Sequence, residues 1–217
     1  MKKVGIIHTT PATIESLKRL VTEIIQEVEV INILDDSILG NMCSGTNVEY
    51  VRKRWISYAE VLENLGVDAV LSACSTVGEF AEEADEILKV PVYRIDEAMA
   101  EKTVKMGTHI AVFATLNSTL MPTTRLIQKK AAQMGKTVEI ENVLVEGAYD
   151  ALMQGNKQLH NQKIAEKVSK HSAQSDVLVF AQASMASAVE GIEDIRHKVL
   201  TSPELGIMKL KRDLEKA

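Results

Sequence analysis

Short apolar runs alternate with amphipathic segments along the chain, and this alternation limits the possible folds more than any other feature of the sequence. Residues 4–8 (VGIIH) and 175–181 (SDVLVFA) contain continuous apolar runs, which are typical of strands buried on both faces. Elsewhere, as in residues 14–25 and 48–65, apolar residues recur at helical spacing. Strands that alternate with helices form parallel sheets through right-handed crossovers. The sequence therefore predicts an α/β fold.

The same patterns predict where the individual elements lie. Strands are expected at residues 4–8, 28–34, 68–73, 91–95, 109–115, 137–145 and 175–181, with a last short strand at 196–200. Helices are expected from Pro11, which follows the capping residue Thr10, at residues 48–65, from about residue 77, and at 120–134, 147–153, 158–173 and 202–217. No low-complexity linker interrupts this succession, and the domain boundary is expected near residues 96–107.

Two segments of the first half recur in the second half at a nearly constant separation. Residues 6–13 (IIHTTPAT) align with residues 112–119 (VFATLNST) at a separation of 106 residues. Residues 68–76 (DAVLSACST) align with residues 176–184 (DVLVFAQAS) at 108 residues. A period of this length is too long for a solenoid. The alternative is that any two strand–helix units look alike, but two blocks with nearly the same offset favour a duplication into two similar α/β halves.

Composition and charge exclude several classes of partner. The chain has 217 residues, of which 46% are hydrophobic, which suits one or two compact domains. A net charge of −5 argues against a nucleic acid or an anionic membrane as the main partner. No apolar run approaches the roughly 18 residues that cross a bilayer, and the segment MKKVGIIHTT is interpreted as a first strand rather than a signal peptide.

The chain has only two cysteines, Cys43 and Cys74. Two thiols in a chain of this length form no disulfide framework, and no CxxC motif or Cys/His cluster predicts a zinc site. We therefore expect a cytoplasmic protein whose thiols are reduced. The absence of the GxGxxG and GxxxxGK[ST] patterns argues against a bound nucleotide.

The duplication predicts a ligand site at the carboxyl ends of the strands. If the two halves pair about a pseudo-twofold axis, these ends can face one crevice, and ligands of open α/β sheets bind outside such ends. Hydroxyls, amides and the N–H groups of helix starts would meet there and could bind a small carboxylate. The segments concerned are Thr9–Thr10, Cys74–Thr76, Thr115–Thr119 and Gln182–Ser184.

Five motifs in this order resemble the aspartate/glutamate/hydantoin racemase superfamily, which includes arylmalonate decarboxylase and maleate isomerase. They are IIHTTPAT, LDDSIL, ACSTVGE, ATLNSTLMPT and TSPELG. The resemblance covers essentially the whole chain. It implies two pseudo-symmetric α/β domains with the active site between them, and chemistry beside a carboxylate without a metal or an organic cofactor. It also implies that the C-terminal helix returns to the first domain, so the domains are expected at 1–97 plus 200–217 and at 98–199. A homodimer is usual in this superfamily.

The resemblance assigns Cys74 as the catalytic acid/base. Racemases of the superfamily use two cysteines on opposite faces of the substrate, and the position of the second holds Gln182 here. A glutamine amide does not exchange protons at neutral pH, so racemisation by two thiols is not expected. Cys43 is expected in the loop after the second strand and is interpreted as a thiol without a function.

Each candidate residue also has a purely structural interpretation. Cys74 could be a small buried residue at a strand end, although its place before a helix start favours the thiolate. The hydroxyl residues could simply cap helices, which is compatible with binding an oxyanion. Gln182 could be a satisfied buried amide. The residues predicted to bind the substrate are Thr9, Thr10, Ser75, Thr76, Asn117, Ser118, Thr119, Gln182, Ala183 and Ser184.

Other polar groups are interpreted as structural. His8 is expected as a core or strand-end histidine, and His160 as a solvated residue in a loop or at a helix start. Asp35 and Asp36 are expected to form turn and cap contacts after a strand. The acidic segment 79–87 (EFAEEADEI) is interpreted as a solvated helix face.

These observations together predict an isomerase or racemase-like enzyme. It would act on a small carboxylic acid (an amino acid, a hydroxy acid or a dicarboxylic acid) by proton transfer at Cys74 through an enediolate or carbanion. Loss of CO₂, which would make it a decarboxylase, remains open, as does a non-catalytic carboxylate-binding protein or an interaction protein with a decayed site. The low aromatic content, 4%, favours an aliphatic substrate.

Overall fold

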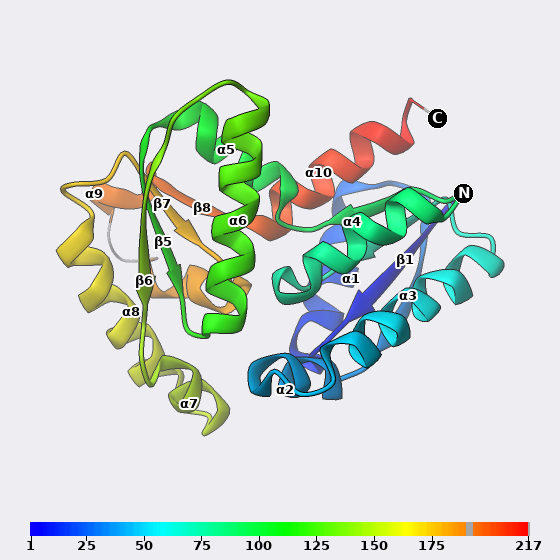
Figure 1. Ribbon diagram of the computed structural model, residues 1–217, viewed down its shortest axis with the longest axis horizontal. Coiled ribbons are helices and arrows are strands. Elements are labelled where there is room, and N and C mark those ends of the chain that lie inside the picture. Colours follow the sequence, from blue (N-terminus) through cyan, green and yellow to red (C-terminus); the bar gives the residue numbers. More distant parts are fainter. Residues whose placement is uncertain (190–192, 217) are drawn as a thin grey trace. The chain divides into compact units, whose positions relative to one another are not determined.

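The computed structural model describes residues 1–189 and 193–216, and the chain divides into two compact units (Figure 1). The first unit contains Met1–Glu97 together with Pro203–Ala217, and the second contains Ala98–Ser202. Each unit has a four-stranded sheet whose strand pairs are all parallel, with helices packed around it. The predicted α/β fold class is therefore confirmed.

The sheet of the first unit has the strand order β2-β1-β3-β4. Its strands are β1 (Lys2–His8), β2 (Val28–Leu34), β3 (Ala69–Ser72) and β4 (Val92–Arg94). The helical segments are η1 (Pro11–Thr13), α1 (Ile14–Ile24), α2 (Ser37–Ser44), α3 (Val48–Asn64), η2 (Ser75–Val77), α4 (Gly78–Ile87) and α10 (Ser202–Leu214). The helix predicted to reach Ala217 ends at Leu214, and Ala217 itself lies outside the described residues.

The sheet of the second unit repeats this order as β6-β5-β7-β8. Its strands are β5 (His109–Ala114), β6 (Glu139–Leu144), β7 (Val177–Phe180) and β8 (Val199–Thr201). The helical segments are α5 (Glu97–Met106), α6 (Asn117–Gln133), α7 (Ala148–Met153), α8 (Lys157–His171), η3 (Ala183–Val189) and α9 (Glu193–Arg196). None of the described helices is long and apolar enough to cross a membrane.

Two aspartates that the internal repeat aligns make equivalent contacts in the two units. The Asp68 carboxylate, just before β3, accepts a hydrogen bond from the N–H of Lys3 at 2.6 Å. The Asp176 carboxylate, just before β7, accepts the N–H groups of Thr108 and His109, both at 2.9 Å. In each unit one carboxylate thus satisfies backbone donors at the start of the central strand, which agrees with a duplication.

We expect Asp176 to make folding stability depend on pH in the acidic range. Hydrogen bonds from the backbone N–H groups of His109 and Thr108 lower the pKa of this exposed carboxyl below its usual 3.8. The stabilisation is complete above the unfolded-state pKa and is lost as the pH falls through the lower folded-state pKa. The free energy of unfolding should therefore fall less steeply below about pH 4 in Asp176→Asn than in the wild type. Urea unfolding at a series of pH values tests this, and identical slopes would contradict it.

The two faces of the first sheet pack into separate apolar clusters. Ile6 and Leu71 pack with residues of α1 and α10 on one face. Ile7 and Val70 pack with residues of α3 and α4, Trp55 among them, on the other face. Because successive side chains of a strand point to opposite faces, the residues that follow these strands are sorted in the same way. Cys74 accordingly packs against the α3–α4 cluster.

Three sequence predictions are wrong. Cys43 lies in helix α2, not in a loop, although its side chain is exposed as expected. His160 is completely buried in α8, with Nδ1 2.9 Å from the carbonyl oxygen of Ala148 and Nε2 3.4 Å from that of Ser184. The segment 79–87 is also not simply a solvated face, because Phe80 and Ala84 are buried and several of its carboxylates make specific contacts.

Candidate functional site

The carboxyl edge of the first sheet brings together two of the predicted segments. Thr9 and Thr10 follow β1, and Cys74, Ser75 and Thr76 follow the neighbouring β3. The Ala73 N–H donates to the carbonyl oxygen of Ile7 at 3.0 Å, which continues the strand pairing up to Cys74. A surface hollow at the opposite edge of this sheet is lined by Lys2, Gln26 and Lys211, among others, and carries none of these residues.

Cys74 is half-buried and stands immediately before a helical segment. Its backbone is extended (φ −133°, ψ 120°), and it occupies the N-cap position of η2, which leads directly into α4. The Sγ atom caps no backbone N–H group, and the thiol is free. The carbonyl oxygen of Cys74 instead accepts the N–H of Val77 at 3.4 Å and the Ser72 hydroxyl at 3.5 Å. The backbone of the turn is thus fixed by hydrogen bonds that leave the thiol available.

Thr9 provides a buried hydroxyl without a partner at the same edge. Its side chain is 2% exposed, and Oγ1 finds no hydrogen-bond partner among the described residues. An unpaired buried hydroxyl costs about 1–3 kcal/mol, so such groups usually have a ligand or water in the working protein. Because β1 and β3 are adjacent, this hydroxyl and Cys74 belong to neighbouring strand ends.

The other hydroxyl residues of this edge have different surroundings. The Thr10 hydroxyl accepts the N–H of Ala12 at 3.4 Å and caps η1, as the sequence predicts. Ser75 and Thr76 are both buried within η2, so neither is a solvated turn residue. The Ser75 N–H donates to no backbone carbonyl among the turn and cap hydrogen bonds of the described residues. Capping therefore explains Thr10, whereas the backbone N–H that follows Cys74 has no such backbone acceptor.

The carboxyl edge of the second sheet joins Thr115 and Gln182 across 67 residues of sequence. The Oε1 atom of Gln182 accepts the Thr115 N–H at 2.6 Å and the Thr115 hydroxyl at 2.9 Å. This amide is therefore held in place by the end of β5. Ala183 and Ser184 are exposed and begin η3, and the Ser184 carbonyl faces the buried His160.

The first residues of α6 also lie at this second edge. Asn117 is exposed, Ser118 is half-buried and Thr119 is buried. The N-cap residue of α6 is Leu116, whose side chain cannot cap, and its carbonyl oxygen accepts the Thr119 N–H at 3.1 Å. The N-cap position thus belongs to Leu116 and not to Ser118 or Thr119, for which capping is the structural alternative.

His8 is a core residue, as expected. Its ring is completely buried, with Nδ1 2.8 Å from Thr13 Oγ1 and Nε2 2.9 Å from Asn32 Oδ1. Burial lowers the pKa of His8, against the opposing effect of the Asn32 hydrogen bond. Both ring nitrogens are engaged, so His8 fixes the end of η1 relative to β2.

The Asp35 carboxylate also has structural partners. It accepts hydrogen bonds from the hydroxyls of Ser37 (2.6 Å) and Tyr58 (2.9 Å) and pairs with Arg54. Burial alone would raise the pKa of Asp35, but these contacts outweigh it and lower that pKa.

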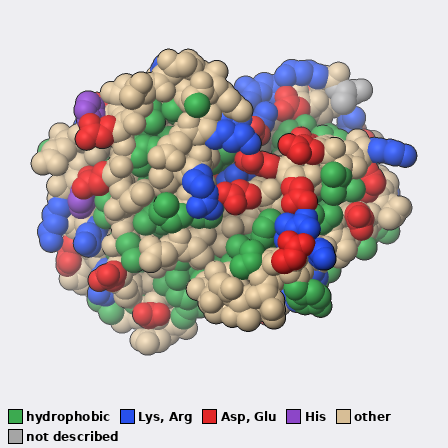
Figure 2. All heavy atoms as spheres, viewed as in Figure 1, with side chains coloured by type: hydrophobic (Ala, Val, Ile, Leu, Met, Phe, Trp, Pro, Cys, Tyr) green, Lys and Arg blue, Asp and Glu red, His purple; other side chains and the backbone are tan. Residues whose placement is uncertain are grey.

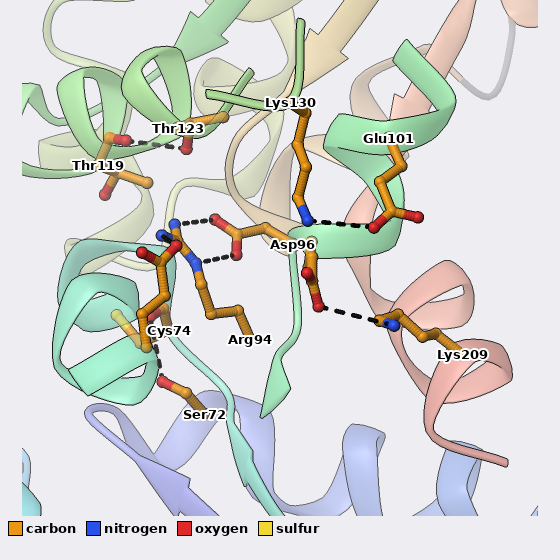
Figure 3. A network of polar contacts seen from close by, with 11 residues as sticks. Ser72, Cys74, Arg94, Asp96, Glu101, Thr119, Thr123, Lys130 and Lys209 are labelled. Carbon is orange, nitrogen blue, oxygen red and sulfur yellow. Dashed lines mark hydrogen bonds and ion pairs between the residues drawn. The ribbon is translucent and has the colours of Figure 1, made fainter. Parts of the chain in front are cut away.

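Sequence reasoning missed a buried ion pair beside the cysteine segment, which is drawn in Figure 3. The side chains of Arg94 and Asp96 are 4% and 0% exposed and form two parallel hydrogen bonds. Their positions after a short strand carry no periodic signal. The only hint in the sequence is that two opposite charges flank an apolar isoleucine. Among the described residues, no group of three or more His, Cys, Asp or Glu side chains could hold a metal ion.

Charged side chains elsewhere are mixed in sign. Figure 2 shows acidic and basic side chains interspersed on the face that it presents, without a broad field of one sign. This distribution agrees with the modest net charge of −5.

The fold is that of a duplicated α/β protein, with polar candidate residues at the carboxyl ends of strands in both sheets. The sequence model of the Asp/Glu/Hydantoin racemase family matches residues 3–209, and the chain belongs to this family. The resemblance drawn from the motifs is confirmed. No curated protein matches the chain.

Solved structures of similar fold include several racemases. A glutamate racemase from Bacillus anthracis is 15% identical with a TM-score of 0.80, over 99% of this chain and 82% of that one. A glutamate racemase from Francisella tularensis, in complex with D-glutamate, is 17% identical with a TM-score of 0.76, over 99% and 81%. An aspartate racemase from Picrophilus torridus is 18% identical with a TM-score of 0.74, over 99% and 95%.

Proposed function

We propose that the chain is a cofactor-independent racemase or isomerase of a small carboxylic acid, with Cys74 as its acid/base. The observation that carries this proposal is the free, half-buried thiol at the end of β3, next to the strand end of Thr9, whose hydroxyl has no partner among the described residues. Membership of the racemase family supports the reaction class. The thiol and the hydroxyl stand on adjacent strand ends of one sheet, where a small substrate can contact both.

In the proposed reaction, the Cys74 thiolate removes the proton on the carbon next to the substrate carboxylate. The C–H bonding electrons move into the carboxyl group and give an enediolate, and the new S–H bond holds the proton. Delivery of the proton by Cys74 to a neighbouring carbon of a conjugated intermediate gives an isomer and regenerates the thiolate. Return to the same face gives exchange alone, and inversion needs a second acid on the opposite face, after which the Cys74 thiol loses its proton to water. The hydroxyl of Thr9 and the Ser75 N–H are proposed to stabilise the charge that develops on the carboxyl oxygens. One such donor typically contributes about 3 kcal/mol to the transition state.

Residues of the second sheet's carboxyl edge are proposed as further substrate-binding residues. The Gln182 Nε2 group is available as a donor because the two Thr115 hydrogen bonds occupy only its Oε1 atom. The exposed Asn117 and Ser184 are further candidates for polar contacts. The remaining proposed contacts come from Thr10, Thr76, Ser118, Thr119 and Ala183.

Gln182 limits the stereochemistry of the proposed reaction. An amide does not take up or release protons near neutral pH, so it cannot act as the second acid/base of an inversion. Cys74 alone serves one face of the substrate, which supports a one-sided proton shift. Loss of CO₂ followed by protonation from Cys74 is the second candidate, and it is favoured by the same observation. We also propose that the enzyme is a homodimer, which light scattering in solution would test.

Incubation of candidate acids with the protein in D₂O tests the proposal. The first acids are the D and L forms of glutamate and aspartate, because similar structures include a glutamate racemase in complex with D-glutamate and an aspartate racemase. Malate, maleate and methylmalonate extend the series to hydroxy and dicarboxylic acids. We expect deuterium at the carbon beside the carboxylate with retained configuration, as one base predicts.

The other outcomes of this experiment are equally informative. Exchange with inversion would reveal an additional acid/base, and release of CO₂ would establish a decarboxylase. Tight binding of an acid without any exchange would contradict an enzymatic function and favour a carboxylate-binding protein.

A further inference from the structure

The guanidinium of Arg94 is held in one orientation by two carboxylates. Its Nε and Nη2 atoms donate to Asp96 Oδ1 and Oδ2 at 2.9 and 3.0 Å, and its Nη1 donates to Glu82 Oε1 at 2.7 Å. Paired N–H···O bonds of this kind fix the plane of a guanidinium as well as its position. Asp96 is completely buried, so solvent does not compete for its two hydrogen bonds with Arg94.

The same guanidinium packs directly against the first residue of α4. A Cβ atom on Gly78 would collide with the Cζ, Nε and Nη2 atoms of Arg94, so only glycine allows this approach. Glu82, which lies one turn further along α4, is also bonded to Arg94. The first turn of α4 therefore packs against the Arg94 guanidinium, whose position and plane are fixed.

Both ends of the cysteine turn, residues 73–77, are tied to the strand that carries Arg94. At the near end, Ser72 pairs with Arg94 in the β3–β4 register, and the Ser72 carbonyl accepts the Ile95 N–H at 3.1 Å. At the far end, Gly78 rests on the guanidinium. The five residues between these anchors include Cys74 and the Ser75 N–H.

From these contacts we propose that Arg94 is a positioning residue for catalysis, which fixes the cysteine turn through Gly78 and Ser72. The inference rests on the proposed role of Cys74. Burial alone would lower the pKa of Arg94, but Asp96 and Glu82 outweigh it and raise that pKa. The guanidinium that contacts the turn therefore stays charged at every working pH. Arg94 acts only through the turn and takes no part in the proton transfer itself.

Hydrogen–deuterium exchange followed by mass spectrometry tests the structural half of this inference. Arg94→Lys keeps the charge but cannot form the two parallel bonds, and Arg94→Met combined with Asp96→Leu replaces the pair with apolar side chains. We expect the amides of residues 73–79 to exchange at least about tenfold faster in both variants while β1 stays protected, as in a local opening. The matched control is Arg52→Lys, because Arg52 also pairs with a glutamate of α4, Glu83, but at the surface.

Steady-state kinetics with an acid that exchanges deuterium tests the catalytic half. In Arg94→Lys, kcat should fall about 10- to 100-fold while KM changes by less than about twofold, because misplacing a reacting group slows the chemical step. Arg52→Lys should retain the wild-type kcat. The inference would be overturned if the Arg94 variants exchanged residues 73–79 at the wild-type rate. It would also be overturned if exchange were equally faster in β1, or if kcat did not change.

The two proposals can fail separately. The exchange measurement needs no substrate, so it tests whether Arg94 stabilises the cysteine turn even if Cys74 proves not to be catalytic. Conversely, a Cys74→Ser variant with full activity would remove the proposed function without changing the exchange result.

Discussion

Cys74→Ser is expected to lower the rate of substrate deuteration by about 10³-fold or more, within the range attributed to a general acid/base. A serine hydroxyl keeps the size and position of the side chain but does not ionise near neutral pH. Folding should be affected little, since the half-buried thiol caps no backbone group. The free energy of unfolding should therefore change by less than about 1 kcal/mol. The rate is measured by NMR loss of the α-proton signal in D₂O, and stability by urea unfolding.

Cys43→Ser is the matched control for this substitution. Cys43 is the other thiol of the chain, and it is exposed on α2. This variant should keep the wild-type rate, and in its background iodoacetamide can label only Cys74. Full activity of Cys74→Ser, or equal losses in both variants, would show that Cys74 is not the acid/base.

The sheets were predictable because their signals are local. A strand buried on both faces reads as a continuous apolar run. Strands β3, β5 and β7 lie within the predicted runs, and β1 begins two residues before its run. The repeat of about 107 residues also anticipates that the two sheets share one strand order, since similar sequences encode similar units. Asp68 and Asp176 show this at the level of single hydrogen bonds.

Contacts between distant segments were not predictable. His160 appears polar and solvated in its own neighbourhood, yet α7 and η3 cover it, and both of its partners are backbone carbonyls without a sequence signature. Helix α2 was missed because it is only 8 residues long and contains Gly40, a poor helix former. In both cases, packing against other elements overrides the local pattern.

The candidate site was predictable as a set of strand ends but not in its polar detail. Sequence alignment of the two halves marks Thr9, Cys74 and Gln182 as corresponding to strand ends, and each does follow a strand. Which hydroxyl remains unpartnered, and which amide is held by a neighbouring strand, depends on pairings that span up to 67 residues. The Arg94–Asp96 pair was invisible for a further reason, because charged residues are expected at the surface unless their partners are known.

Asp96→Ala is expected to lower the free energy of unfolding by about 3–5 kcal/mol, the usual cost of removing one partner of a buried ion pair. The loss arises because the Arg94 guanidinium, 4% exposed, would keep only Glu82, whose side chain is 29% exposed. Glu49→Ala, at a surface pair whose glutamate is 63% exposed, should leave the free energy of unfolding almost unchanged.

Replacing both Arg94 and Asp96 separates the cost of a buried unpaired charge from the cost of lost side-chain packing. The double variant Arg94→Met with Asp96→Leu removes both buried charges, and the Glu82 carboxylate that loses Arg94 is 29% exposed, so water can hydrate it. Such replacements are often neutral, so the unfolding free energy should return to within about 1 kcal/mol of the wild type. Its catalytic rate should nevertheless stay low, because an apolar side chain cannot hold the cysteine turn by directed hydrogen bonds. Urea unfolding of the four proteins measures the stability differences. A cost below about 1 kcal/mol for Asp96→Ala would mean that the pair is hydrated in solution, as exposed pairs are.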